Sequence, residues 1–184
     1  MKRAFDLLAA LVLLLPTLFL MAVLAPLIRL DSPGSPIFRQ TRVGRNEVPF
    51  TLVKFRTMRT DTGDRPSHEV GAASMTRMGP FLRKTKIDEL PQVLAVLSGA
   101  MSFVGPRPCL PSQTELIEAR REQDAFSVRP GITGLAQIDG LDMSQPRKLA
   151  LVDGEYVRRR TMALDLSIFV RTALGKGRGD AARK

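Results

Sequence analysis

The sequence predicts a mainly helical α+β protein, in which an N-terminal membrane helix with a break in its middle precedes a small domain with a short β-hairpin. Three patterns support this fold class. An uncharged run covers Leu7 to Ile28, two β-branched stretches flank a turn at residues 44–47, and apolar residues recur at helical spacing after Asp88. With 184 residues the chain can bury a core without disulfide or metal support. We divide it into a membrane anchor (1–30), a catalytic domain (31–175) and a basic tail (176–184).

The uncharged run is long enough to reach across a bilayer, because its 22 residues extend about 33 Å as a helix and the hydrocarbon core is about 30 Å thick. A cleaved secretory signal fits less well, since such signals have shorter apolar runs and Pro26 would follow the cut. Cations lie on both flanks, Lys2 and Arg3 before the run and Arg29 after it. A spanning helix carries this excess on its cytoplasmic flank only. With both flanks expected at the cytoplasmic headgroups, the pattern favours a re-entrant helix, with a spanning helix as the alternative.

Pro16 marks the expected break in this segment. Proline lacks an amide donor and kinks a helix. Thr17 beside it is expected to bond the backbone carbonyls that the break leaves unpaired.

A β-hairpin is predicted for residues 37–43 and 48–58, joined by Gly44-Arg45-Asn46-Glu47. Lys54 and Arg56 alternate in the second strand, so their side chains share a face. Both are candidate phosphate-binding residues, and a solvated strand face is the alternative interpretation.

Asp88 and Glu89 form an acidic pair in a basic neighbourhood. A short helix is expected to start at Pro80 and to carry Arg83, and a second runs from about Asp88 to Leu97. Acidic residues in a first helical turn complement the helix dipole, which explains the pair if it is taken alone. Among so many cations, the pair also fits a site for a phosphorylated substrate and a divalent cation.

Arg107 is framed by Pro106 and Pro108, which stiffen the loop that presents it. A guanidinium held in this way suits bidentate phosphate binding. The turn at residues 129–134 is similarly rich in proline and glycine. Helices are expected at residues 112–123 and 147–161, and an apolar helix at 163–174 that can lie in a membrane interface.

The formal net charge of +10 implies an anionic partner, either nucleic acid, an acidic membrane or a phosphorylated small molecule. Aromatic residues for base stacking are few, with no Trp and one Tyr. Nucleic acid is therefore not an expected partner. The single histidine, His68, is expected to be a solvated loop residue.

Five motifs in order resemble the bacterial sugar transferases, and more narrowly the small monotopic phosphoglycosyl transferases that start glycan assembly on a polyprenol carrier. They are Lys2-Arg3 with Phe5-Asp6, Lys54 to Met58, Asp88-Glu89-Leu90-Pro91, Val104 to Pro108, and Arg129 to Gly134. The resemblance implies a re-entrant helix and a catalytic domain on the cytoplasmic face of the bacterial inner membrane. It also implies a nucleophile at Asp88 with Glu89 as its partner, both near Mg²⁺, and phosphate contacts at Arg83 and Arg107. Leu15 stands where the family has serine at the helix break.

The implied reaction transfers a sugar 1-phosphate from a UDP-sugar to polyprenol (undecaprenyl) phosphate and releases UMP, in two steps through a covalent aspartyl intermediate. Its expected partners are these two substrates, the phospholipid bilayer and downstream glycosyltransferases. The alternative is a membrane-tethered basic protein that binds nucleic acid or anionic lipid without catalysis. That alternative explains the charge and the apolar start but not the acidic pair.

Overall fold

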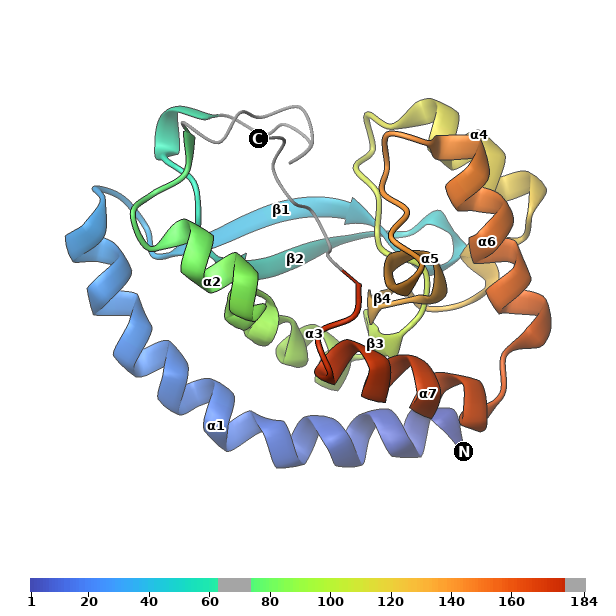
Figure 1. Ribbon diagram of the computed structural model, residues 1–184, viewed down its shortest axis with the longest axis horizontal. Coiled ribbons are helices and arrows are strands. Elements are labelled where there is room, and N and C mark those ends of the chain that lie inside the picture. Colours follow the sequence, from blue (N-terminus) through green and yellow to red (C-terminus); the bar gives the residue numbers. More distant parts are fainter. Residues whose placement is uncertain (63–73, 178–184) are drawn as a thin grey trace.

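The computed structural model describes residues 1–62 and 74–177, so His68 and most of the basic tail lie outside the described residues. The fold is mainly helical with two small sheets, as predicted in class (Figure 1). Its elements are α1 (Lys2–Asp31), β1 (Ile37–Val43), η1 (Arg45–Glu47), β2 (Pro49–Phe55), η2 (Thr60–Thr62), α2 (Gly79–Thr85), η5 (Ile87–Gln92), α3 (Val93–Ser98), β3 (Ser102–Val104), α4 (Thr114–Glu122), η6 (Ala125–Ser127), β4 (Gly131–Thr133), α5 (Leu135–Ile138), α6 (Pro146–Arg159) and α7 (Met162–Ala173). The domain division given above stays a prediction.

The N-terminal segment forms one continuous helix that contains Pro16 and Pro26. Figure 1 shows that α1 bends about half-way along its length. The interruption expected at Pro16 is therefore a bend, because the helix continues on both sides of the proline. Thr17 is buried, and its hydroxyl has no hydrogen-bond partner among the described residues, so the bond expected from it to the backbone is not formed.

The start of α1 is tied to the globular domain by its charged residues. The Lys2 Nζ lies 2.6 Å from Asp165 Oδ2 in α7 and donates to the Val104 carbonyl at 2.9 Å. Arg3 donates to the carbonyls of Val96 and Leu97 at the end of α3, at 2.7 and 3.1 Å. These contacts show that protein groups engage both cations, while their expected position at the lipid headgroups stays a prediction.

The end of α1 is tied to the same domain. Asp31 Oδ2 accepts a hydrogen bond from the Met78 amide at 3.1 Å. Leu24 and Ile28 pack with Phe55 of β2 and Leu82 of α2. Both ends of this long apolar helix therefore contact one domain.

The remaining face of α1 is apolar and exposed. The helix is long and apolar enough to cross a membrane by length and composition. Its exposed large side chains are Leu8, Leu11, Val12, Leu15, Leu18, Phe19, Val23, Leu27 and Leu30. A continuous exposed apolar surface of this kind indicates contact with an apolar partner, and the length and composition of the helix fit lipid as that partner.

The predicted hairpin is confirmed. β1 and β2 pair antiparallel, with Ile37 opposite Phe55 and Val43 opposite Pro49. Phe55 and Leu52 are buried on the hairpin, whereas Asn46 in the connection adopts a left-handed conformation that suits asparagine in a tight turn.

A second pairing, between β3 and β4, is parallel and was not predicted. Ser102 lies opposite Gly131 and Val104 opposite Thr133. The backbones approach so closely beyond the strand ends that a Cβ at Gly131 would lie 2.2 Å from the Gly105 nitrogen. Glycine at both positions thus brings the proline-framed loop of Arg107 against the turn at 129–134.

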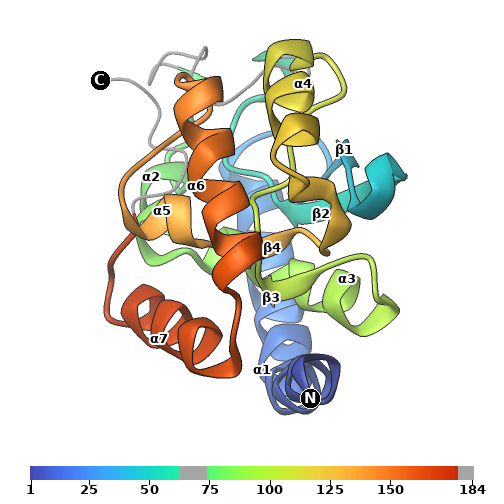
Figure 2. The same ribbon diagram turned by 90° about the vertical axis from the view of Figure 1, so that its right-hand side faces the viewer.

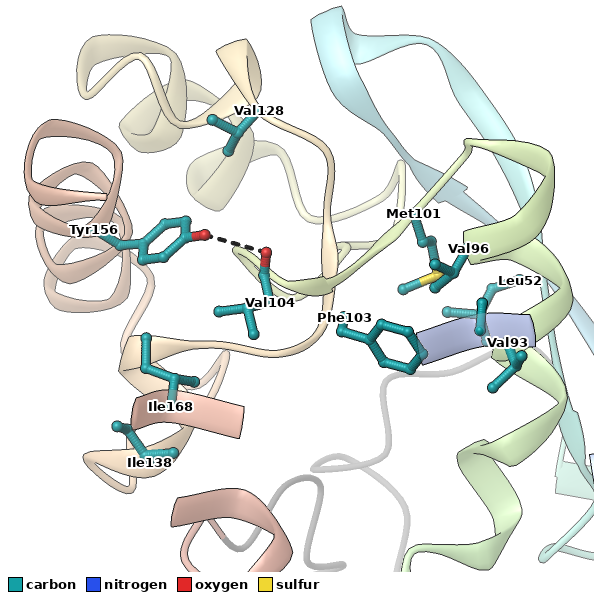
Figure 3. Packing of buried hydrophobic residues seen from close by; sticks show 11 residues of the cluster. Leu52, Val93, Val96, Met101, Phe103, Val104, Val128, Ile138, Tyr156 and Ile168 are labelled. Atoms are coloured by element: carbon teal, nitrogen blue, oxygen red, sulfur yellow. Dashed lines mark hydrogen bonds between the residues drawn. The ribbon is translucent and has the colours of Figure 1, made fainter. Parts of the chain in front are cut away.

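The largest core cluster lies around β3 (Figure 3). Phe103, Val104, Val96 and Tyr156 belong to it, and the Tyr156 hydroxyl lies 3.1 Å from the Val104 carbonyl. Figure 2 shows α3 and α7 on either side of the N-terminal part of α1, with α4 and α6 farther from it. The core thus links the membrane helix to the loop that follows β3.

Candidate active site

The acidic pair lies on the short 3₁₀ helix η5, not in the first turn of a regular α-helix as expected. Lys86 lies between α2 and η5 and adopts a left-handed conformation (φ 57°), so the chain changes direction just before the pair. Non-glycine residues seldom adopt this conformation, and those that do are often found at functional sites. Neighbouring side chains of a 3₁₀ helix point in different directions, and the two acids accordingly have different surroundings.

Asp88 is a buried carboxylate, with 6% of the residue exposed. Burial and the adjacent charge of Glu89 raise its pKa to about 6, while Lys54, Arg83 and Arg107 act in the opposite direction. At neutral pH the group is therefore mostly ionised. An ionised, poorly hydrated carboxylate surrounded by cations is suited to nucleophilic attack on a phosphoryl group.

Glu89 is held by Arg107. Its Oε1 lies 2.6 Å from the Arg107 Nη2, and both side chains are mostly buried. The glutamate is thus oriented by an ion pair, whereas Asp88 carries the raised pKa. The unequal roles expected for the two acids match this difference in surroundings.

The loop that presents Arg107 is fixed by backbone contacts on both sides. The Gly131 amide donates to the Pro106 carbonyl at 2.9 Å, and Arg42 donates to the Pro108 carbonyl at 3.0 Å. Arg42 is itself buried. Its role was not predicted, because nothing near Arg42 in the sequence indicates a partner so far along the chain.

Lys54 and Arg83, whose charges lower the pKa of Asp88, line a cleft of about 270 Å³, and neither acid is among its lining residues. Arg83 Nε donates to the Thr57 hydroxyl at 2.9 Å, and the Lys54 ammonium lies 5.4 Å from the centre of the Phe38 ring. The residues that line the cleft are Ser35, Ile37, Phe38, Arg39, Gln40, Lys54, Arg56, Thr57, Met58, Arg59, Thr60, Thr62 and Arg83. Five of them are cations, so the cleft suits an anionic group.

Arg56 has a different environment from the one expected for a phosphate-binding residue. Its guanidinium donates to the Pro33 carbonyl and, at 2.6 Å, to the Ser32 carbonyl in the turn that follows α1. It borders the cleft, but two of its nitrogens are engaged by backbone oxygens. Arg56 thus fixes the turn after α1, and its predicted contact with phosphate stays a prediction.

Two groups of polar residues near the site were missed from the sequence. Lys2, Asp165 and Tyr156 form a network, with the Tyr156 hydroxyl 2.7 Å from Asp165 Oδ1. Gln137 is buried beside Arg107 in a second pocket. Tyr156 is the one tyrosine in the chain, but no spacing indicated its partners. Gln137 lies between the turn at 129–134 and the helix expected at 147–161, in a segment for which no element was predicted.

The arrangement of these motifs agrees with a comparison to known families. The sequence profile described as Bacterial sugar transferase matches residues 1–176. The chain belongs to this family. The family's members are transferases, so this sugar transferase is an enzyme.

Several curated relatives of the sugar transferase are similar along most of its length. The UDP-glucose:undecaprenyl-phosphate glucose-1-phosphate transferase of Caulobacter vibrioides is 42% identical over 182 residues, which cover 93% of this chain and 67% of the relative. The protein of the same name from Escherichia coli is 37% identical, with 91% and 38% covered. The uncharacterized sugar transferase EpsL of Bacillus subtilis is 42% identical, with 94% and 85% covered. Another relative, from Komagataeibacter xylinus, matches this chain over 35% of its own length, so the chain corresponds to only part of some relatives.

The acidic pair of the sugar transferase offers a donor set that suits Mg²⁺. No cluster of three or more His, Cys, Asp or Glu residues fit to hold a metal occurs in ranges 1–62 and 74–177. Mg²⁺ is commonly bound by one or two carboxylates together with substrate phosphates and water, and does not require such a cluster. Asp88 and Glu89 supply two carboxylates of this kind.

Proposed function

We propose that this sugar transferase moves a sugar 1-phosphate from a UDP-sugar to undecaprenyl phosphate. Five of the relatives that match it are named for transfer of a sugar phosphate to undecaprenyl phosphate. The observation that supports the proposal most strongly is the buried Asp88 carboxylate, which interacts with the charges of Lys54, Arg83 and Arg107. Lys54 and Arg83 also line the cationic cleft. Nucleotide sugar and lipid phosphate are both anionic, and such a cleft attracts both.

The reaction proceeds in two displacements at one phosphorus. An oxygen of Asp88 attacks the β-phosphorus of the UDP-sugar, and the bond from this phosphorus to the bridging oxygen breaks, which releases UMP. An oxygen of undecaprenyl phosphate then attacks the same phosphorus and breaks the bond to Asp88. The product is undecaprenyl diphosphate sugar, and the carboxylate is regenerated.

The cations of the site lower the electrostatic barrier to this attack. Lys54 and Arg83 border the cleft, and Arg107 reaches the pair from a stiff loop. Their charges offset the negative charge on the phosphoryl oxygens in the transition state. When Mg²⁺ is bound at Asp88 and Glu89, it supplies further charge neutralisation on the diphosphate.

The attachment of α1 supports a monotopic arrangement at the membrane. Both ends of the helix contact the same domain, and the exposed face between them is apolar. A helix that crossed the bilayer in full would have its two ends on opposite sides of about 30 Å of hydrocarbon. The contacts of both ends with one small domain argue against such a crossing. We therefore place the catalytic domain at the cytoplasmic face of the bacterial inner membrane, where nucleotide sugars are made.

The site also gives a reason for this placement. The polyprenol tail remains in the bilayer, because each exposed CH₂ costs about 0.8 kcal/mol. A shallow anchor keeps Asp88 near the headgroup plane, where the lipid phosphate lies. The lipid-linked product then serves as the acceptor of downstream glycosyltransferases.

The proposal is tested by UMP release. Purified protein in lipid nanodiscs is incubated with undecaprenyl phosphate, Mg²⁺ and each of a panel of UDP-sugars. We expect UMP release and a lipid-linked sugar with at least one donor, and neither product when the lipid acceptor bears no phosphate in a multiple-turnover assay. Absence of UMP release with every donor, in a protein that is folded by thermal melting, contradicts the proposal.

A further inference from the structure

We propose that Gln137 binds the neutral part of the nucleotide sugar, in a second pocket that Arg107 also lines. This inference rests on the proposed function and adds a recognition site to it. The ligand group is a hydrogen-bond donor, either the imide N3–H of uracil or a sugar hydroxyl.

The side-chain amide of Gln137 has one end engaged and the other end unpaired. Its Nε2 donates to the Ile132 carbonyl at 3.3 Å, which sets the orientation of the amide. Its Oε1 is buried and has no hydrogen-bond partner among the residues that the structure describes. The residue as a whole is 9% exposed. A buried carbonyl oxygen without a donor is unusual in a folded protein and is explained when a ligand supplies the donor.

The walls of this pocket differ from those of the cationic cleft. Its apolar lining residues are Gly134, Ala136, Leu141, Met143 and Leu149, and its polar ones are Arg107, Gln137, Asp142 and Asp153. Asp153 is buried and bonded to Arg120 through Oδ2. Among these polar residues the acceptors outnumber the cations, so the pocket suits N–H or O–H donors better than a phosphate.

Arg107 connects this pocket to the acidic pair. The same side chain lines the pocket and lies 2.6 Å from Glu89 Oε1. A diphosphate bound at Asp88 and Arg107 therefore leaves one neutral end of the UDP-sugar next to Gln137. The pocket is narrow, with space for about one water molecule. The flexible, half-buried Met143 side chain forms part of its wall and can move when a larger group enters.

The test pairs a change in the protein with a change in the ligand. Gln137→Met keeps the length of the side chain and removes the acceptor. Gln145→Met is the matched control, because Gln145 is exposed and precedes α6. Binding of UMP, N3-methyl-UMP, 2′-deoxy-UMP and the accepted UDP-sugar is measured by calorimetry in nanodiscs, and thermal melting verifies that each variant is folded.

If Gln137 contacts the nucleoside, we expect Gln137→Met to bind UMP roughly tenfold more weakly. The wild type then discriminates against N3-methyl-UMP or 2′-deoxy-UMP by a similar factor, and the variant does not. If Gln137 contacts the transferred sugar, UMP binding is unchanged, whereas the UDP-sugar binds roughly tenfold more weakly to Gln137→Met. In both cases Gln145→Met behaves as the wild type.

The inference is overturned if UMP and the UDP-sugar bind folded Gln137→Met within twofold of the wild type. It is also overturned if Gln145→Met loses as much affinity as Gln137→Met. If Gln137→Met does not fold, the affinities of the wild type for N3-methyl-UMP, 2′-deoxy-UMP and deoxy-sugar analogues of the donor are compared with those for UMP and the UDP-sugar. Uniform affinity for all of these contradicts the inference. Failure of the proposed function is distinct, since it appears as absent UMP release in the wild type.

Discussion

Glu89 and Arg107 form an ion pair of 2.6 Å beside a second carboxylate, Asp88, that carries a raised pKa. The two acids are adjacent in sequence but unequal in surroundings. Burial is the main cause of the raised pKa of Asp88, and the negative charge of Glu89 is the next. This inequality supports the proposal that Asp88 is the nucleophile and that Glu89 has a supporting role.

The pH dependence of the first half-reaction tests this assignment. We expect kcat/KM for UMP release by the wild type to fall below pH 6, because Asp88 must be ionised to attack. Glu89→Gln removes a like charge and thereby lowers the pKa of Asp88. The acid limb of the variant should therefore shift to lower pH, whatever the loss in its maximal rate. A limb that stays in place, or that shifts to higher pH, contradicts the assignment.

The stability of Asp88→Asn provides a second test. A carboxyl whose folded pKa lies above its unfolded value of 3.8 destabilises the fold once it ionises. Stability of the wild type is thus lost as the pH rises from about 4 through about 6, by up to about 3 kcal/mol. Asp88→Asn should melt at a higher temperature than the wild type at pH 7.5, and the advantage should vanish toward pH 4.

The matched control for this measurement is Asp139→Asn, at an exposed position. Its melting temperature should follow that of the wild type at both pH values. If Asp88→Asn is no more stable than the wild type at pH 7.5, the carboxylate is not destabilised by its surroundings.

Lys2→Met tests how the membrane helix is attached. The substitution leaves Asp165 buried without its cation. Removal of one partner of a fully buried pair lowers the free energy of unfolding by about 3–5 kcal/mol, and we expect a smaller loss, of about 2 kcal/mol, because Lys2 is partly exposed. Thermal melting in nanodiscs measures the loss. Arg147→Met, in the exposed pair of Arg147 with Glu115, should change stability by less than about 0.5 kcal/mol. Equal stability of the two variants would contradict a role for the pair of Lys2 with Asp165 in attaching α1 to the domain.

Substitutions of Arg56 and Arg83 should have different effects, the first mainly on stability and the second mainly on substrate binding. Arg56→Met removes two charge-assisted hydrogen bonds to the turn after α1, at a cost of about 2–4 kcal/mol, with little change in KM. Arg83→Met should raise the KM for the UDP-sugar roughly tenfold or more and lower the melting temperature less. A KM increase in Arg56→Met equal to that in Arg83→Met would support Arg56 as a phosphate-binding residue.

The hairpin and the basic surroundings of the acidic pair could be predicted from the sequence, because both depend on local signals, whereas the 3₁₀ helix that carries the pair was not predicted. β-Branched residues flank a turn in one case, and cations surround two carboxylates in the other. The parallel pairing of β3 with β4 could not be predicted, since each strand has three residues and the partners are far apart in the chain. The only local indication was the presence of Gly105 and Gly131. Glycine permits a close approach of two backbones, but the sequence does not tell which segment is the partner.

Side-chain partners distant in sequence limited the prediction of the site. Strand alternation placed Arg56 and Lys54 on one face, and both border the cleft, yet Arg56 is engaged by the turn at Ser32. The contact of Lys2 with Asp165 was not predicted, because the two residues lie 163 positions apart. Charge patterns along a sequence thus indicate which groups are available but not which of them meet.

We propose that Asp88 becomes covalently attached to the sugar phosphate during the reaction. The most direct measurement is intact-protein and peptide mass spectrometry after incubation with the UDP-sugar and Mg²⁺ in the absence of undecaprenyl phosphate. We predict one sugar-phosphate adduct, located on the peptide that carries Asp88, released by addition of undecaprenyl phosphate and absent from Asp88→Asn. UMP release and transfer in Asp88→Asn at the wild-type rate, or an adduct on another residue, would contradict the account.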